Sequence, residues 1–366
     1  MKNPFNTRVP SFDGAAINQT IQRALASAGL DTGTGPMHGV TETIRRALAA
    51  GGLPGTAPDP DSGAGADVVA GSFQAHRFSN GAGSRSYKVY VPAATGAAPR
   101  AVIVMLHGCT QSADDFAAGT QMNRLADEHG FLVVYPEQAA QANASKCWNW
   151  FNPQDQVRDA GEPSLIAGIA REVARGHGAD PCRIFVAGLS AGAAMSVVLG
   201  ETYPELFAGV GVHSGLPYGS AHDLPSAMAA MKGGRSGMPG LKSLSGEAGI
   251  PRTKVRRAVP VIVFHGDRDH IVQPTNGAHI VRQALETHGA LQAISQAGAA
   301  TGGRRFSRTV HVDTEGQVRI ENWTLHGAGH AWSGGHASGS YTDGSGPDAS
   351  AEMVRFFMAL RRAGSA

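Results

Sequence analysis

The sequence predicts an α/β fold, in which a mostly parallel sheet carries helices on both faces. Short apolar runs of strand length alternate with amphipathic helical segments from about residue 72 onward. Hydrophobic residues make up 42% of the 366 residues, which is enough for one large core, and 49 Gly with 20 Pro supply many turns. Because each strand–helix–strand connection crosses over one face of the sheet, consecutive strands should run parallel.

The strands and helices are expected in alternation along the chain. Strand segments are apolar runs such as AVIVML at 101–106, as expected where both faces of a strand are buried. Helical segments repeat apolar residues at intervals of three and four. The expected strands are residues 87–91, 101–106, 131–135, 183–187, 259–264 and 317–325. The expected helices are residues 122–129, 165–174, 191–200, 277–288 and 351–362, the last with Asp348 or Ser350 as its N-cap.

Two segments depart from this alternation. Residues 1–70 form a leader in front of the main domain at 71–366, and they contain two similar copies, TIQRALASAGL at 20–30 and TIRRALAAGGL at 43–53. The copies predict two short amphipathic helices, which are marginal in water unless they pack against another surface. The leader is therefore either poorly ordered or a docking element. Residues 219–256 lack clear periodicity, so we expect a lid or a loop-rich insertion there.

Charge and composition exclude several classes of protein. Lys and Arg total 31 against 29 Asp and Glu, a net charge of +2 with no dense basic run, so no nucleic-acid partner is expected. No apolar stretch reaches the roughly 18 residues of a membrane span. The first residues lack the apolar segment of a signal peptide, which leads us to expect a cytoplasmic location. The three Cys residues show no zinc-binding spacing, and neither a metal nor a cofactor is expected.

Residues 188–192 read GLSAG and fit the pattern G-x-S-x-G. In a chain this rich in Gly the pattern alone is weak, but it follows the apolar strand at 183–187 and opens the helix at 191–200. This is the setting of the nucleophile elbow in α/β-hydrolases, where small residues beside the serine permit a sharp strand-to-helix turn. A Gly-rich turn without chemistry is the alternative. The motif therefore predicts an α/β-hydrolase fold with Ser190 as the nucleophile.

A serine hydroxyl needs a base to remove its proton, and in this fold the acid and then the base follow the serine along the chain. The strand at 259–264 runs into a loop with two carboxylates. We favour Asp269 as the acid because it lies further along the loop, and we expect Asp267 to be a turn residue capped by its own backbone. Of the 15 His residues, His330 in the Gly-rich loop after the last strand is the expected base. His326 ends that strand and should be structural.

A tetrahedral intermediate needs hydrogen-bond donors for its oxyanion. One donor should be the backbone N–H of Ala191, directly after the nucleophile. The second should come from the loop after the strand at 101–106, where Gly108 permits a sharp turn. The candidates there are the N–H of Cys109 and that of Thr110. An ordinary strand-end turn is the alternative explanation for this glycine.

Several longer stretches resemble the esterases of the polyhydroxybutyrate depolymerase family, over about residues 72–362. They are LHGCTQSADDFAAGTQMNRLAD (106–127), CWNWFNPQDQVRDAGEPSLI (147–166), GLSAGAAMS (188–196), GVHSGLPYG (211–219), HGDRDHIVQPTNG (265–277) and GHAWSGG (329–335). The CWNWF and GHAWSGG stretches are specific. By position, the resemblance implies Ser190 as nucleophile, Asp269 as acid and His330 as base. One departure is Ala193, where the elbow usually continues with Gly.

The resemblance also implies a carboxylic-ester substrate, in the first place poly- or oligo-(3-hydroxybutyrate). A feruloyl- or acetyl-xylan-type carbohydrate esterase shares much of the pattern and is the alternative. From a different class, the chain would be a noncatalytic binding module on a hydrolase scaffold, although three triad residues in the right order argue against it. With a polymer substrate, residues 1–70 would provide granule docking or self-association.

Three of the four Trp residues, Trp148, Trp150 and Trp332, fall in loops expected on the active face. They either line a hydrophobic acyl or polymer groove or simply pack the loops.

The three cysteines divide between the two edges of the expected sheet. Cys109 follows one strand and Cys147 lies in the loop after the next, so both should sit on the active face. Cys182 precedes the strand at 183–187 and belongs at the opposite edge. If any pair is oxidised it should therefore be Cys109–Cys147, which would brace the oxyanion loop and leave Cys182 free.

Overall fold

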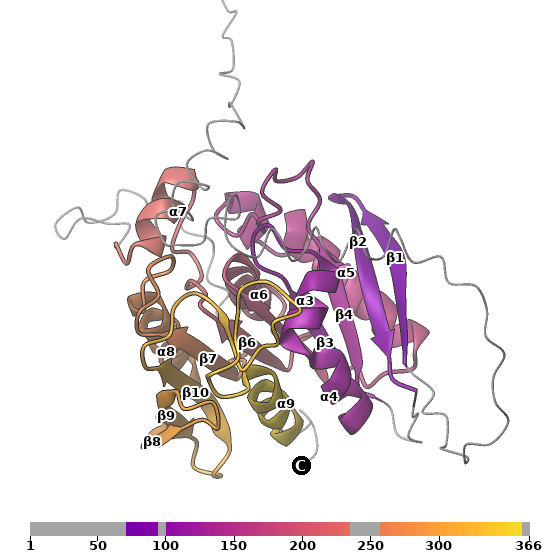
Figure 1. Cartoon of the computed structure of the whole chain (residues 1–366). Coiled ribbons are helices and arrows are strands. Elements are labelled where there is room, and N and C mark those ends of the chain that lie inside the picture. The colour runs from indigo at the N-terminus through magenta and orange to yellow at the C-terminus, as the bar shows by residue number, and fades with distance from the viewer. Residues whose placement is uncertain (1–70, 94–99, 235–256, 361–366) are drawn as a thin grey trace, which may run out of the picture. The chain divides into compact units, whose positions relative to one another are not determined.

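In this computed structural model, residues 71–93, 100–234 and 257–360 are described. They form a ten-stranded sheet with the strand order β1-β2-β4-β3-β5-β6-β7-β10-β9-β8 (Figure 1). The strands are β1 (Ser72–Asn80), β2 (Gly83–Val91), β3 (Val102–Leu106), β4 (Leu132–Glu137), β5 (Ile184–Leu189), β6 (Gly209–His213), β7 (Val261–Gly266), β8 (Gln292–Ala299), β9 (Arg305–Val312) and β10 (Val318–Leu325).

The centre of the sheet is parallel and its two edges are antiparallel. Strands β4, β3, β5, β6, β7 and β10 all run in the same direction. The hairpin β1–β2 continues the sheet in antiparallel fashion beside β4, and the hairpin β8–β9 does so beside β10. The mostly parallel sheet expected from the sequence is therefore confirmed. Because parallel strands end at one common edge, the loops that follow them gather there.

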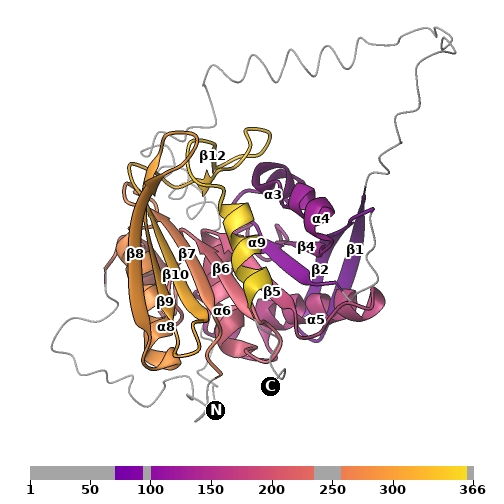
Figure 2. The same ribbon diagram turned by 90° about the horizontal axis from the view of Figure 1, so that it is seen from below.

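Helices cover both faces of the sheet, as Figure 2 shows. One face carries α5 (Gly161–Gly176), α6 (Ala191–Thr202) and α8 (Thr275–His288), and the other carries α3 (Ala113–Thr120), α4 (Met122–His129) and α9 (Ala349–Ala359). Each face has its own buried cluster of apolar side chains. In β3, Val102, Val104 and Leu106 belong to the cluster under α5 and α6, whereas Ile103 and Met105 belong to the cluster under α4 and α9. The continuous apolar runs of the sequence thus fill two cores at once.

Each strand and helix expected from the alternating pattern after residue 72 is present in the described residues, with ends that differ by a few positions. The helix near the C-terminus begins after Asp348, whose side chain accepts a hydrogen bond from the N–H of Ala351 at 2.9 Å. Of the two N-cap candidates, Asp348 is therefore the one used.

Strand β6 is a central strand with the sequence GVGVH, and it was not expected from the sequence because glycine is rare in strand interiors. The structure explains Gly211 by close packing. A Cβ at Gly211 would lie 2.8 Å from the Cβ of Ala187 on β5 and 2.8 Å from the sulfur of Met353 on α9. The hairpin β8–β9 was also missed, since the largely exposed β8 lacks an apolar pattern.

Other expectations fall partly or wholly outside the described residues. The insertion expected at 219–256 includes α7 (Leu224–Met231), which Asp223 caps together with Ser226. Residues 235–256 and the leader helices expected within 1–70 lie outside the described ranges. Among the helices of the described residues, none is both long and apolar enough to cross a membrane. The same residues hold no group of three or more His, Cys, Asp or Glu side chains placed to bind a metal ion.

The packing of β6 leads to a test of the sheet. Gly211→Ala should lower the free energy of unfolding by about 1–3 kcal/mol, because the new methyl group meets the fixed Cβ of Ala187. Urea denaturation followed by circular dichroism measures the change. Gly176→Ala at the end of α5 is the matched control, since a Cβ there meets no atom within 4 Å. Equal stability of the two variants would contradict this account of β6.

Candidate active site

Ser190 lies in the turn between β5 and α6, where the backbone reverses sharply. Its φ of 57° and ψ of −119° are rare for a residue other than glycine, and strain of this kind is concentrated at functional sites. A Cβ at Gly188 would lie 2.6 Å from the Leu106 carbonyl oxygen, and one at Gly192 would overlap that oxygen. The Ser190 N–H donates to the carbonyl oxygen of His213 at the end of β6, 2.9 Å away. The turn has the geometry of a nucleophile elbow.

Asp269 and His330 are in direct contact at the same edge of the sheet. Asp269 follows β7, and His330 follows the neighbouring parallel strand β10 in the loop of residues 326–333 (the base loop). His330 Nδ1 lies 2.7 Å from Asp269 Oδ2, and the two side chains are 7% and 0% exposed. The other carboxylate oxygen of Asp269 accepts hydrogen bonds from the N–H groups of Ile271 and Val272. The structure thus brings together the two residues for which acid and base roles are expected.

The Asp269 carboxyl group is held in its ionised form. Burial by itself raises the pKa of this group, but the charge of His330, the hydrogen bond between them, the charge of His265 and the Val272 N–H together lower the pKa to about 2. The carboxylate fixes the imidazole with a proton on Nδ1, so that Nε2 remains for a proton from the nucleophile. Within the described part of the chain, Ser190 Oγ makes no hydrogen bond to His330. Contacts of this kind often tighten only when substrate binds.

Asp267 is not capped by its own backbone, which corrects the expectation from the sequence. Its carboxylate accepts a hydrogen bond from the Gly327 N–H at 2.6 Å and lies 3.0 Å from His326 Nδ1. His326 Nε2 lies 2.9 Å from Ser307 Oγ on β9. Asp267 therefore anchors the first part of the base loop to the loop after β7, and His326 connects the base loop to β9.

The loop after β3 (residues 107–111, the oxyanion loop) contains the pair of candidates for the second oxyanion donor. Of the two N–H groups left open by the sequence, that of Thr110 donates to the Ser145 carbonyl oxygen at 2.7 Å. The N–H groups of Cys109 and Ala191 donate to no other residue in the described ranges. These are the two N–H groups in the chain positions that suit an oxyanion hole.

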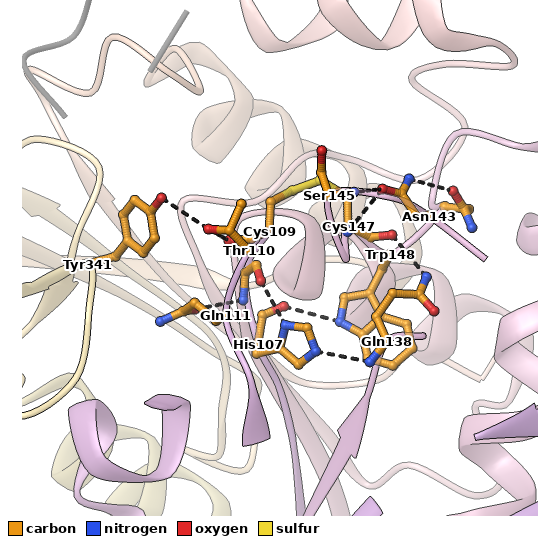
Figure 3. The surroundings of a disulfide bond; sticks show 12 residues. His107, Cys109, Thr110, Gln111, Gln138, Asn143, Ser145, Cys147, Trp148 and Tyr341 are labelled. Carbon is orange, nitrogen blue, oxygen red and sulfur yellow. Dashed lines mark hydrogen bonds between the residues drawn. A yellow bond between two sulfur atoms is a disulfide. The ribbon is translucent and has the colours of Figure 1, made fainter. Parts of the chain in front are cut away.

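A disulfide joins the oxyanion loop to the loop after β4, as Figure 3 shows. Cys109 Sγ and Cys147 Sγ are 2.04 Å apart, while Cys182 is free and exposed. Beside the disulfide, the indole N–H of Trp148 donates to the His107 carbonyl oxygen at 3.1 Å. The pairing is the one that the topology favours.

The three tryptophans, for which groove lining and loop packing were both considered, are packed in the interior, which favours the packing role. Trp148 is 0% exposed, Trp150 6% and Trp332 1%. The indole N–H of Trp332 donates to Ser350 Oγ at 3.0 Å, and its ring packs edge-on against Phe116. Large aromatic side chains contribute most when fully buried, and here they hold the loops to the sheet.

Sequence reasoning missed Glu162, a carboxylate that is 3% exposed at the start of α5. One oxygen accepts hydrogen bonds from the side chains of Arg85 (3.1 Å), Asn149 (2.8 Å) and Gln138, and the other accepts from the Asn149 N–H at 2.8 Å. Burial, together with the charge of Asp155, raises the pKa of Glu162. Its only signal in the sequence was its place within the stretch at 147–166.

Gln111 is a second residue that the sequence analysis missed. Its side-chain oxygen accepts a hydrogen bond from the Gly108 N–H at 2.9 Å. Its amide nitrogen donates to Asp115 Oδ2 at 2.8 Å and to the Ser340 carbonyl oxygen at 3.1 Å. The side chain is 2% exposed and ties the oxyanion loop to the segment that follows the base loop.

Several known proteins are similar to this chain in sequence or in fold. Poly(3-hydroxyalkanoate) depolymerase C of Paucimonas lemoignei is 34% identical over 261 residues, which cover 70% of this chain and 61% of that protein. Feruloyl esterase B of Neurospora crassa is 30% identical over 221 residues, covering 56% of this chain and 70% of that protein. The solved structure of an acetyl xylan esterase from Aspergillus awamori superposes with a TM-score of 0.62 at 22% identity, over 79% of this chain and 100% of that chain.

These similarities establish the α/β-hydrolase fold and the family. The chain spans 61% of the length of the Paucimonas depolymerase, less than two thirds. The family model described as esterase PHB depolymerase matches residues 85–310, which is more than half of the chain. The chain therefore belongs to the esterase PHB depolymerase family.

Proposed function

We propose that this protein is a serine esterase that hydrolyses carboxylic esters through an acyl-enzyme on Ser190. The observation that carries the proposal is the 2.7 Å contact between His330 Nδ1 and Asp269 Oδ2, at the sheet edge where the strained Ser190 also lies. The contact orients the imidazole so that Nε2 serves as the base. The N–H groups of Cys109 and Ala191, for which the described residues provide no acceptor, support an oxyanion hole beside the nucleophile.

In the proposed mechanism, Ser190 Oγ attacks the ester carbonyl carbon while His330 Nε2 removes the serine proton. The N–H groups of Cys109 and Ala191 stabilise the negative charge on the carbonyl oxygen. The tetrahedral intermediate collapses as His330 gives the proton to the leaving alcohol. A water molecule then attacks the acyl-enzyme with His330 again as base, and the carboxylic acid leaves. Asp269 holds the imidazole and stabilises its charged form throughout.

Among esters, we propose poly- or oligo-(3-hydroxybutyrate) as the substrate class. The family match and the likeness to a poly(3-hydroxyalkanoate) depolymerase support this choice. A feruloyl- or acetyl-xylan-type activity is the second candidate, favoured by the likeness to a feruloyl esterase. Comparing rates on 3-hydroxybutyrate oligomers, polymer suspension, feruloyl esters and acetyl xylan separates the two. Much faster hydrolysis of the feruloyl or acetyl-xylan substrate would overturn the first choice.

We also propose that residues 1–70 contribute docking to a polymer granule or to a second copy of the chain, and no catalytic group. The proposal rests on the two apolar repeats within a segment that precedes Ser190, Asp269, His330 and each described strand. A truncated chain starting at Ala70 should keep its rate on a soluble ester and lose association with granules or itself, measured by granule sedimentation and light scattering. Loss of soluble-ester activity in a folded truncated chain would contradict this division of roles.

The nucleophile is tested by Ser190→Ala. The variant should hydrolyse p-nitrophenyl butyrate about 10³- to 10⁶-fold more slowly than the wild type, and a fluorophosphonate probe should no longer label it. Ser307→Ala is the matched comparison, because Ser307 also ends a Ser–His–Asp chain. That variant should still be labelled at Ser190, as found by mass spectrometry. Labelling that survives Ser190→Ala and disappears in Ser307→Ala would refute the assignment, and an unlabelled wild type would favour a noncatalytic binding module.

The low pKa of Asp269 predicts how stability depends on pH. Its folded pKa of about 2 lies below the value of roughly 3.9 for an exposed Asp, so the ionised group stabilises the folded state above about pH 4. This contribution is lost as pH falls through about 2. The difference in unfolding free energy between wild type and Asp269→Asn should therefore shrink as pH falls from about 4 toward 2. Urea titrations between about pH 4 and pH 2 measure it, and a difference that grows as pH falls within this range would contradict the prediction.

A further inference from the structure

His213 ends β6, the strand that lies between the strand of the nucleophile and the strand of the acid. It is 0% exposed. Its carbonyl oxygen accepts the hydrogen bond from the Ser190 N–H at 2.9 Å, so its backbone touches the nucleophile elbow directly. The sequence analysis assigned this histidine no role.

The side chain of His213 reaches the base loop on the other side. Its Nε2 accepts a hydrogen bond from the N–H of Ser333 at 3.0 Å, three positions after His330. Its ring stacks on that of Trp332, with centroids 5.2 Å apart and planes at 26°, and on that of Phe264 at 5.9 Å and 8°. Two consecutive residues of the base loop are therefore fixed to one imidazole.

The contacts also define the protonation state of this imidazole. Because the Ser333 N–H is the donor, Nε2 must carry a lone pair, and the ring proton of a neutral imidazole is then on Nδ1. Nδ1 lies 3.3 Å from Ser214 Oγ, which can accept it. Burial, with the charges of His265 and His330, lowers the pKa of His213 to about 3, which is consistent with a neutral ring. A charged ring would place an N–H against the Ser333 N–H.

We propose that His213 is a positioning residue that sets the placement of the His330 imidazole relative to Ser190. The inference rests on the proposed esterase function. His213 binds the nucleophile elbow through its backbone and the base loop through its ring. A shift of the elbow or of the base loop would therefore strain the contacts of the other. Without an acceptor, the buried Ser333 N–H would be left unpaired, and the base loop would move to find another partner. Such a displacement affects the transfer of the serine proton more than the binding of substrate.

Two substitutions separate the hydrogen bond from the stacking. His213→Phe keeps a ring between Trp332 and Phe264 but removes the acceptor for the Ser333 N–H. His213→Gln offers a side-chain oxygen near the position of Nε2 but loses the ring. On p-nitrophenyl butyrate, His213→Phe should lower kcat about 10- to 100-fold with KM changed less than about 3-fold. His213→Gln should recover kcat to within about 5-fold of the wild type.

A matched control removes a similar hydrogen bond far from the base loop. The hydroxyl of Tyr203, a side chain that is also 0% exposed, accepts from the Asp159 N–H at 2.8 Å, just past the far end of α6. Tyr203→Phe should lower the melting temperature and leave kcat unchanged. If His213→Phe behaves like Tyr203→Phe, with normal kcat, His213 only packs the core and the proposal is wrong. Equal loss of kcat in folded His213→Gln and His213→Phe would also overturn it.

A measurement on the wild-type protein needs no variant to fold. In ¹H–¹⁵N spectra of the imidazole groups, His213 should be neutral with its proton on Nδ1 from pH 8 down to about pH 5. A proton on Nε2, or a charged ring within this range, would exclude the Ser333 contact and the proposal with it. Failure of the positioning role can be distinguished from failure of the proposed esterase function. If the wild type hydrolyses no ester and is not labelled at Ser190, the proposed esterase fails, whereas normal turnover in His213→Phe defeats only the positioning role.

Discussion

Ser190 has a strained backbone conformation, which costs of the order of 1–3 kcal/mol, and the surrounding structure holds it there. β3 passes so close to the turn that residues 188 and 192 must lack side chains. Helix α6 begins at the next residue, and β6 accepts the Ser190 N–H. The serine therefore cannot relax without moving β3, β5, β6 and α6 together. These elements carry both apolar cores. The packing of the whole sheet therefore offsets the conformational free energy of the strained turn.

The loops at this edge are positioned by polar side chains, each of which serves a different loop. The buried Glu162 holds the CWNWF segment and the buried Gln111 holds the oxyanion loop, whereas the exposed Asp267 holds the base loop. A buried polar group that loses its partner costs about 1–3 kcal/mol, so alternative loop conformations are penalised. The disulfide at Cys109 and the buried tryptophans add covalent and apolar restraints to the same loops. The arrangement of the candidate site thus depends on residues outside the set Ser190, Asp269 and His330.

Two Ser–His–Asp arrangements occupy neighbouring loops, and side-chain contacts alone do not distinguish them. His326 contacts both Asp267 and Ser307, a more complete chain of hydrogen bonds than the Asp269–His330 pair makes with the nucleophile. The difference lies in the backbone. Ser307 lies within the regular strand β9, whereas Ser190 lies on a strained turn beside a backbone N–H with no partner among the described residues. A serine acts as a nucleophile only where nearby donors can stabilise the negative charge of the oxyanion, in addition to having a base.

The order of the main strands and helices, the turn at residues 188–192 and the expectation that Asp269 rather than Asp267 is the acid came from the sequence alone. Each depends on a local pattern: apolar runs, glycine spacing, or the distance of a residue from a strand end. The tertiary structure decided the rest. It buried the tryptophans, required Gly211 inside a central strand, and gave Asp267 a partner at Gly327, 60 residues away along the chain. The exposure, close packing and hydrogen-bond partners of a residue depend on segments that meet only when the sheet is assembled. A local sequence pattern does not specify those neighbours.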